Sequence, residues 1–467
     1  DFHELGPWPR HPRVLLVVGK GHNGGVALIG AVALGERLPE ATFFLLPTAP
    51  RDEWRGLTRK ALKTLEHSHD VHEVNLPTIG VGVYDVCLDG ALGMRGKPPL
   101  RSELRQVLHA LNAHPRIGLR AAVDLPSGLG DEAAFRADFT YATGIVKEKV
   151  LAPDSISHVG RLRYADVGFF DPTSPVAAPE SLTRVCADVI LRPLLRLRAP
   201  VTEKRAHGHL LVVAGHRTMP GALLMNVRAA LRSGCGLVTA VAPASVQPAL
   251  AAAAPEAMWV PCPETPEGGL AADGWDLIAS KLDRATAVLT GSGLGTEPGT
   301  RALVEKLVTA SAKPLVLDAD ALDAGLLPLL TARAAGAETI LTPHAGEFAR
   351  LTGEAAGPVS DEALRDFCAS HRCVTLLKSH RSQIGGAEHV AYSLTGGPVL
   401  ARGGSGDLLA GVVAGLLAQG TANAFDTACQ AQHWYGLAAD CVARNAGHHA
   451  VVTSDFLPAL TQALREF

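Results

Sequence analysis

The segment Leu400-Ala401-Arg402-Gly403-Gly404-Ser405-Gly406-Asp407 leads directly into the apolar run 408–417. A turn of small residues therefore precedes a predicted helix, and a carboxylate stands in the first turn of that helix. The first N–H groups of a helix lack partners within the helix, and together with the helix dipole they attract anions such as phosphate. A bound phosphate would repel the Asp407 carboxylate, so a carboxylate at this position makes sense mainly as the base for a hydroxyl that attacks phosphorus. The segment therefore predicts phosphoryl transfer to an alcohol.

A purely structural role stays open for this loop when it is considered alone, because glycine-rich turns precede helices in many α/β proteins. The loop is not a P-loop, since the chain has no Gly-Lys-Ser or Gly-Lys-Thr ending. It also lacks the glycine spacing of dinucleotide-binding domains. The rest of the sequence has to distinguish the two interpretations.

Length and composition indicate a globular protein of about two or three domains. The chain has 467 residues, 47% of them hydrophobic and 19% charged, with a net charge of -3. This charge favours neither nucleic acid nor an anionic membrane as a partner. The longest apolar runs are shorter than the ~18 to 20 residues that span a bilayer. The eight cysteines form no Cys-x-x-Cys pair, and residues 1–12 show no signal-peptide pattern, so we expect reduced thiols and a cytoplasmic location.

Short apolar runs alternate with Ala- and Leu-rich segments, which is the pattern of parallel β/α units. Strands so apolar are typical of sheets that are buried on both faces. We therefore expect two doubly wound, three-layer α/β domains, over residues 1–195 and 204–467, joined by a charged linker at 196–203. The expected strands are 14–18, 42–46, 83–88 and 121–123 in the first half, and 210–214, 237–241, 287–289, 314–317, 339–341 and 374–377 in the second.

Six segments of the second half combine a predicted strand end or helix start with glycine, carboxylate, histidine or lysine. Ligands bind at the carboxyl edge of such sheets, so these segments together predict one site. They are Gly215 with Gly221-Ala222, Gly291-Ser292-Gly293-Leu294-Gly295, Asp318-Ala319-Asp320, Thr342-Pro343-His344-Ala345-Gly346-Glu347, Lys378-Ser379-His380-Arg381, and the opening loop.

The first half carries a comparable set of oxygen donors at its strand ends. His22-Asn23-Gly24-Gly25 follows the first strand, Asp89 and then Gly93-Met94-Arg95-Gly96 follow the third, and Asp124 and Ser127 follow the fourth. Hard oxygen donors beside glycine backbone suit an alkali cation or a sugar-phosphate, and they suit zinc poorly.

Over nearly its whole length the chain resembles the bifunctional enzymes that repair hydrated NADH and NADPH. The first half is similar to NAD(P)H-hydrate epimerase, and the second half is similar to the ADP- or ATP-dependent NAD(P)H-hydrate dehydratase, which has a ribokinase-like fold. The second resemblance depends on Met219-Pro220-Gly221-Ala222, the strand-end segments quoted above, Leu377-Lys378 and Gly403-Gly404-Ser405-Gly406-Asp407, in the family's order and spacing.

The resemblance implies two groups of ligand contacts in the second half. The hydrated nicotinamide nucleotide would contact Ala222, Gly293, His344 and Asp407. ADP or ATP, accompanied by Mg²⁺, would contact Lys378, Ser379, His380, Arg381, Ser382, Gly403, Gly404, Ser405 and Gly406. The implied reaction phosphorylates the ring hydroxyl of the S-epimer, with Asp407 as base, and then expels phosphate, which is a better leaving group than hydroxide. The choices between ADP and ATP, and between NADH and NADPH hydrates, stay open.

For the first half, the resemblance implies an epimerase site with a bound K⁺. The substrate would contact His22, Asn23, Gly24, Gly25, Gly93, Met94, Arg95, Gly96 and Asp124, and Asp124 would also handle the proton. The implied K⁺ ligands are Asn23, Asp89 and Ser127. The family's loop Asn-Asn-Gly-Gly-Asp-Gly is here His22-Asn23-Gly24-Gly25-Val26-Ala27, and the family's helices ahead of the first strand are missing. An active epimerase and a domain that only binds or scaffolds therefore both stay open, as does assembly into a homo-oligomer.

Two further functions stay open at this point. One is a ribokinase-like kinase that releases the phosphorylated small molecule, and the other is a non-catalytic nucleotide-binding module in the first half. The run His67-Ser68-His69-Asp70-Val71-His72 superficially resembles a set of metal ligands, but no distant ligands accompany it, so we expect a solvated face.

Overall fold

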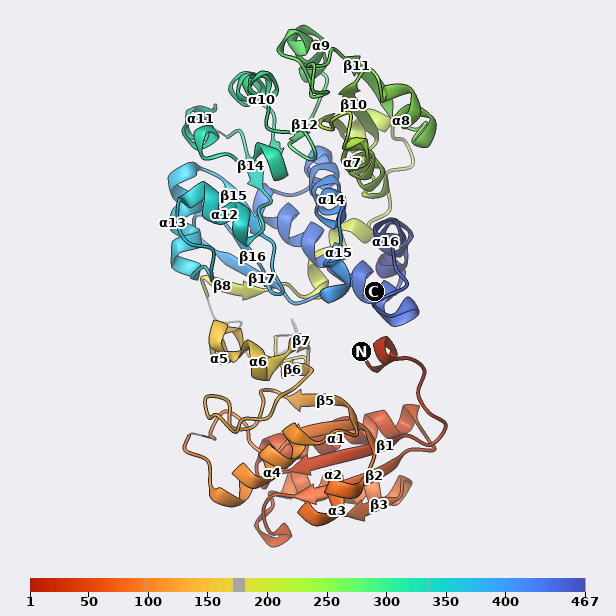
Figure 1. Cartoon of the computed structure of the whole chain (residues 1–467). Helices are drawn as coiled ribbons and strands as arrows, with labels where there is room; N and C mark the ends of the chain where they lie inside the picture. The colour runs from red at the N-terminus through yellow and green to blue at the C-terminus, as the bar shows by residue number, and fades with distance from the viewer. Residues whose placement is uncertain (97, 171–180, 335, 467) are drawn as a thin grey trace. The chain divides into compact units, whose positions relative to one another are not determined.

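The computed structural model describes residues 1–96, 98–170, 181–334 and 336–466. The chain forms two compact units, Asp1–Pro179 and Glu180–Phe467. Each unit contains one sheet with helices on both faces, so the expected α/β fold class is confirmed (Figure 1).

The division between the units lies upstream of the linker expected at 196–203. The strand β8 (Thr183–Val185) pairs in parallel with β17 (Val390–Ser393), so it belongs to the sheet of the second unit. The following 3-10 helix η4 (Asp188–Leu195) places Leu191 in the core of the same unit. The charged residues near 192–204 interrupt the hydrophobic pattern of the sequence, but they do not mark the end of the first unit.

The sheet of the first unit is entirely parallel, in the order β3-β2-β1-β4-β5-β6-β7. The order reverses between β1 and β4, and ligands bind beyond the strand ends at such a point. The strands are β1 (Arg13–Val18), β2 (Thr42–Pro47), β3 (Val71–Glu73), β4 (Tyr84–Gly90), β5 (Ile117–Val123), β6 (Phe139–Thr143) and β7 (Arg161–Ala165).

Helices cover both faces of this sheet, which explains why the consecutive residues 14–18 of β1 are all buried. Leu16 packs in the cluster on one face, with α1 (His22–Arg37) and α2 (Gly56–Ser68). Leu15 packs in the cluster on the other face, with α3 (Leu76–Val81) and α4 (Ser102–Ala113). The continuous apolar strands of the sequence therefore correspond to a three-layer arrangement.

The sheet of the second unit has the order β11-β10-β9-β12-β13-β14-β15-β16-β17-β8, and it is parallel from β11 to β15. The β15–β16 and β16–β17 pairs are antiparallel. The order of the strands reverses between β9 and β12. The predicted site residues follow these two strands and the neighbouring strands β13, β14 and β15. The strands are β9 (His209–Val213), β10 (Leu237–Pro243), β11 (Met258–Cys262), β12 (Ala287–Thr290), β13 (Leu315–Leu317), β14 (Thr339–Leu341), β15 (Val374–Leu377) and β16 (Ser382–Gly385).

Helices also cover both faces of this second sheet. One face carries α7 (Pro220–Arg232), α8 (Gln247–Ala253), α14 (Ser405–Gln419), α15 (Ala424–Ala446) and α16 (Phe456–Arg465). The other carries α9 (Trp275–Leu282), α10 (Pro298–Ala310), α11 (Leu327–Ala332), α12 (Ala345–Thr352) and α13 (Asp361–His371). Among the described residues, no helix is long and apolar enough to cross a membrane. All eight cysteines are buried free thiols, as expected.

Candidate active sites

The glycine-rich loop forms the start of α14. Gly404 is the residue at the N-cap, with φ 86°, and Asp407 lies in the first turn. The backbone angle favours glycine, and a Cβ on Gly404 would lie 2.4 Å from the Met225 sulfur, so the Met225 side chain would have to move. The free N–H groups of this helix start therefore lie next to the Asp407 carboxylate, as the sequence predicts.

Asp407 is partly buried, and its pKa is raised to about 6. Burial is the main cause, the negative charge of Asp318 adds to it, and the positive charge of Lys378 opposes it. The backbone carbonyl of Asp407 accepts a hydrogen bond from Asn226 Nδ2 at 2.7 Å, and this contact ties α14 to α7. A carboxylate with a pKa near neutrality can take up a proton during a reaction.

Asp318 joins three other strand ends of the second sheet and is only 1% exposed. It accepts hydrogen bonds from Ser292 Oγ at 2.9 Å and Thr342 Oγ1 at 2.7 Å. Lys378 Nζ donates to the same carboxylate at 3.2 Å. These contacts tie Asp318 to the residues that follow β12, β14 and β15.

Lys378 also reaches the start of α14. A Cβ placed on Gly406 would lie 3.2 Å from Lys378 Nζ. Lys378 Nζ is 3.9 Å from Glu347 Oε2, and residue 378 forms a parallel bridge with His344. The structure therefore brings Lys378, His344 and Gly406 together, although they are far apart in the sequence.

His344 forms the N-cap of α12 while part of its ring stays exposed. His344 Nδ1 accepts hydrogen bonds from Gly346 N at 3.0 Å and from Glu347 N at 3.2 Å, and His344 N donates to Glu347 Oε2 at 2.7 Å. Because Nδ1 accepts, the proton of the neutral ring is on Nε2. The side chain is 56% exposed, and its Nε2 lies 3.3 Å from Glu347 Oε1.

The predicted substrate residues Ala222 and Gly293 are neighbours. Gly293 has φ 59°, and a Cβ there would lie 2.8 Å from the Ala222 Cβ. Ala319 also has a positive φ of 46°, which is unusual for a residue other than glycine. The next residue, Asp320, accepts a hydrogen bond at Oδ2 from Gly295 N at 2.9 Å. The loop after β12 is thus held against the end of β13.

The predicted nucleotide segment 378–382 forms the turn between β15 and β16. Ser379 N donates to Ser382 Oγ at 3.3 Å, and Arg381 N donates to Ser379 Oγ at 3.1 Å. The Arg381 side chain is buried, and its three guanidinium nitrogens have no hydrogen-bond partner within the described part of the chain. Burial lowers the pKa of Arg381, and burial followed by the charge of Arg381 lowers the pKa of His380.

In the first unit, Asp89 and Ser127 form a buried hydrogen-bonded pair. Asp89 accepts from Ser127 N and from Ser127 Oγ, both at 2.7 Å, and from Ala91 N at 3.1 Å. Asp89 is 0% exposed, and burial raises its pKa to about 6. Asn23 Nδ2 donates to Leu92 O at 2.8 Å and to Val123 O at 3.1 Å, so the amide joins the ends of β4 and β5. The three predicted K⁺ ligands therefore lie at adjacent strand ends.

The other predicted residues of the first unit surround this pair less tightly. A Cβ on Gly93 would lie 3.3 Å from the Asn23 Cβ, so the loop after β4 passes next to Asn23. Met94 and Arg95 are exposed, Gly96 is partly exposed, and Lys97 lies outside the described residues. Gly24 and Gly25 are buried in the first turn of α1, where exposed His22 contacts Arg55 through its ring.

Asp124 pairs with Lys147, a residue that the sequence did not predict as part of the site. Lys147 Nζ contacts Asp124 Oδ1, and both side chains are mostly buried. Lys147 follows β6, whose sequence Phe139-Thr140-Tyr141-Ala142-Thr143 mixes polar and apolar residues. That strand was not expected from the apolar pattern, so the lysine beyond its end was not recognised as a strand-end residue.

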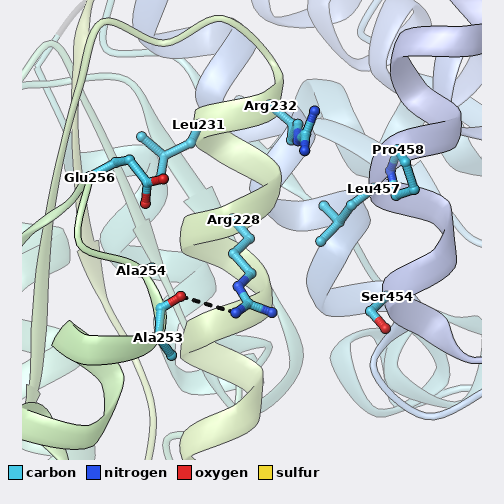
Figure 2. Close-up of a pocket in the computed structure, with 9 residues that line it drawn as sticks. All are labelled: Arg228, Leu231, Arg232, Ala253, Ala254, Glu256, Ser454, Leu457 and Pro458. Atoms are coloured by element: carbon cyan, nitrogen blue, oxygen red, sulfur yellow. Dashed lines mark hydrogen bonds between the residues drawn. The ribbon is translucent and has the colours of Figure 1, made fainter.

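A groove of about 610 Å³ lies away from these residues, between α7, the segment that precedes β11, and α16 (Figure 2). Arg228 donates to Ala253 O at 3.0 Å on one side of the groove. None of the predicted site residues lines it. Arg228 is six residues from Ala222, or about 9 Å along the helix axis.

The comparisons with known proteins agree with the fold. The family model described as NAD(P)H-hydrate dehydratase matches residues 210–461, and the model described as YjeF-related protein N-terminus matches residues 3–149. An ADP/ATP-dependent NAD(P)H-hydrate dehydratase from Bacillus subtilis, co-crystallised with ATP and Mg²⁺, is 26% identical with a TM-score of 0.52. The match covers 61% of this chain and 98% of that one. A ribokinase-like protein from Enterococcus faecalis is 25% identical with a TM-score of 0.53, over 62% of this chain and 98% of that one. The second unit is therefore of the ribokinase-like class.

Full-length relatives extend this assignment to both units. The bifunctional NAD(P)H-hydrate repair enzyme of Moorella thermoacetica is 32% identical, over 97% of this chain and 87% of the relative. The enzyme of the same description from Gloeobacter violaceus is 35% identical, over 88% of this chain and 80% of the relative. The chain belongs to the family of bifunctional NAD(P)H-hydrate repair enzymes.

Proposed function

We propose that the second unit dehydrates the S-epimer of hydrated NADH or NADPH in a reaction that consumes ADP or ATP. The observation that carries this proposal is the Asp407 carboxyl, with its pKa raised to about 6, in the first turn of a glycine-nucleated helix beside Lys378. A base and a phosphate-binding helix start at one place are what phosphorylation of a hydroxyl requires.

In the proposed reaction, Asp407 takes the proton of the ring hydroxyl while the hydroxyl oxygen attacks the terminal phosphorus of the nucleotide. AMP leaves if the donor is ADP, and ADP leaves if the donor is ATP. The phosphate then leaves the ring carbon with the C–O electron pair, and loss of a proton from the neighbouring carbon restores the ring double bond. The Lys378 ammonium and the N–H groups at the start of α14 stabilise the charge on the phosphoryl oxygens.

Substrate and nucleotide would bind on opposite sides of Asp407. Ala222 and Gly293 are small and adjacent, so they leave room for the hydrated ring, and the exposed His344 side chain would contact the polar groups of the substrate. Lys378, Ser379, His380, Arg381, Ser382 and the loop 403–406 would hold the nucleotide. The buried Arg381 guanidinium, which lacks a partner among the described residues, supports an anionic ligand nearby.

Mg²⁺ fits this site as the counter-ion of the nucleotide. Asp318 and Glu347 already accept hydrogen bonds from protein groups, so the phosphates and water would supply most of its ligands. Bound there, Mg²⁺ would neutralise charge on the phosphates.

We propose that the first unit interconverts the R- and S-epimers, with Asp124 as the proton-handling group. K⁺ fits at Asn23, Asp89 and Ser127, because Asp89 is a fully buried carboxylate without a cationic side chain in contact in the described structure. A bound cation would supply the missing positive charge.

The dehydratase is tested by incubating the full chain with pure S-epimer and either ADP or ATP. Restored absorbance of reduced nicotinamide, with one phosphate released per ring, is expected. A flat trace with accumulation of a stable phosphoester would instead indicate a small-molecule kinase. The epimerase is tested by following the R-epimer with wild type and Asp124→Asn. Equal rates for these two proteins would contradict the role of Asp124.

A further inference from the structure

Two neighbouring strands of the first unit, β5 and β6, end in the same tight turn. In each, an N–H donates to the carbonyl two residues earlier at 2.8 Å, across Asp124 in one turn and Gly144 in the other. The central residues have φ 69° and 70°, the conformation of a rare and strained γ-turn. Glycine adopts this conformation freely, whereas Asp124 adopts it with strain. The first turn therefore keeps a carboxylate where glycine would fit better.

The contacts of this carboxylate all fall on one of its oxygens. Lys147 Nζ contacts Asp124 Oδ1, and Thr143 Oγ1 donates to the same oxygen at 3.2 Å. Lys147 Nζ also donates to Thr143 O at 3.3 Å. Asp124 Oδ2 accepts no hydrogen bond from the described residues, and Lys147 has a third N–H to spare. With side chains 17% and 13% exposed, Lys147 and Asp124 together offer a ligand one donor and one acceptor.

Epimerisation of a hydrated nicotinamide ring needs a donor and an acceptor of this kind. Water adds to an enamine with its proton on the carbon β to nitrogen and its hydroxide on the carbon bonded to nitrogen. The hydroxyl can leave again when the nitrogen lone pair forms a C=N bond and an acid protonates the departing oxygen. Water can then add to the other face when a base removes its proton.

Building on the epimerase activity proposed above, we propose that Lys147 is a catalytic residue that supplies the acid for this step. Lys147 Nζ gives a proton to the ring hydroxyl, the C–O bond breaks, and water departs as the C=N bond forms. Asp124 Oδ2 then takes a proton from the water that adds to the opposite face, and the C=N bond returns to a single bond. Rotation of the Asp124 carboxyl then brings the protonated oxygen against Lys147 Nζ, which takes the proton back, so the cycle gains and loses neither protons nor electrons.

Lys147→Met in the full chain is the first test, with Lys149→Met as its matched control. Lys149 is exposed two residues further along and forms no ion pair among the described residues. We expect Lys147→Met to slow enzyme-catalysed conversion of the R- to the S-epimer by about 100-fold or more. Dehydration of pure S-epimer should stay within about twofold, because Lys147 belongs to the other unit, and Lys149→Met should change neither rate. A Lys147→Met protein that epimerises at the wild-type rate would overturn the proposal.

The variant Lys147→Arg and the chemical rescue of Lys147→Ala separate proton transfer from mere placement of Asp124. Lys147→Arg keeps the positive charge but scarcely gives up a proton, so we expect it to be as slow as the Met variant. Wild-type activity in Lys147→Arg would overturn the catalytic role and leave Lys147 a positioning residue. These variants also carry the test if the Met variant fails to fold.

Chemical rescue gives a readout that a structural role would not move. In Lys147→Ala, added primary amines should restore epimerisation, and the restored rate should follow the acidity of the amine. Equal rescue by all amines, or no rescue in a folded variant, counts against proton donation. Failure of the epimerase proposal itself is distinguishable, because the wild-type chain would then leave the two epimers unconverted while Lys147 variants would change nothing.

Discussion

Asp407 is the residue on which the dehydratase account depends. The sequence placed it beside a phosphate-binding helix start, and the structure adds burial and the nearby charge of Asp318, which raise its pKa to about 6. Residues 400–407 alone predict neither the burial nor the charge of Asp318, because Asp318 lies at the end of another strand.

Dehydration should therefore decline as the pH falls through about 6. The Asp407 carboxyl is ionised and can act as a base above this pH, and it is protonated and inactive below it. We expect kcat/KM for pure S-epimer to fall about tenfold per pH unit on the acid side. A pH profile that stays flat down to pH 5 would contradict the assignment of Asp407 as base.

Asp407→Asn should separate catalysis from binding and from stability. We expect a loss of turnover of about 100-fold or more with ADP affinity retained, because the amide keeps the shape but cannot take the proton. The raised folded-state pKa means that ionisation of Asp407 destabilises the folded chain as the pH rises from 3.8 through about 6. The variant should therefore unfold at a higher temperature than wild type at pH 7.5, with a smaller difference at pH 4. Equal losses of turnover and ADP affinity would mean that Asp407 is structural.

At the scale of elements, the sequence predicted the strands that are wholly apolar and missed those that mix polar and apolar residues. The runs 14–18 and 210–214 are continuous apolar stretches because helices cover both faces of their sheets. The strand β6 mixes Thr and Tyr with apolar residues without regular alternation, so its pattern does not distinguish it from a loop, and Lys147 was missed with it. The division between the units was misplaced for a related reason, since β8 is short and polar but pairs with β17.

Replacing Gly404 at the start of α14 should lower the free energy of unfolding, whereas replacing its neighbour Gly403 should not. Gly404→Ala would put a Cβ at φ 86° and 2.4 Å from the Met225 sulfur, so we expect a loss of about 1 kcal/mol or more of unfolding free energy. Gly403→Ala is the matched control, because a Cβ there would meet nothing within 4 Å in the described structure. Chemical denaturation of both variants checks this, and equal stabilities would contradict the loop geometry.

The turn between β15 and β16 carries the buried Arg381 side chain. Its removal should raise the unfolding temperature and weaken the binding of ADP. Arg381→Met replaces a buried guanidinium, which has no partner among the described residues, with an apolar side chain. We expect a higher unfolding temperature without ligand, because a buried unpaired charge is costly. ADP should bind about tenfold or more weakly by calorimetry. An Arg381→Met protein that is destabilised and binds ADP normally would contradict a nucleotide contact.

The whole molecule combines two sheets, each with polar residues beyond the strand ends at its switch point. The family resemblance predicted both activities, and the full-length relatives confirm the family. Individual side-chain partners, such as Asn226 with Asp407, depend on packing between segments distant in sequence and could not be predicted.

The most direct measurement of the central claim follows an equal mixture of R- and S-epimers with the full chain and excess ADP. The account predicts complete recovery of reduced nicotinamide, with one phosphate released per ring. Recovery should be about 100-fold or more slower with Asp407→Asn, and it should be limited to about half in a prompt phase with Asp124→Asn. Accumulation of a phosphorylated ring without recovery, or recovery at the wild-type rate with Asp407→Asn, would contradict it.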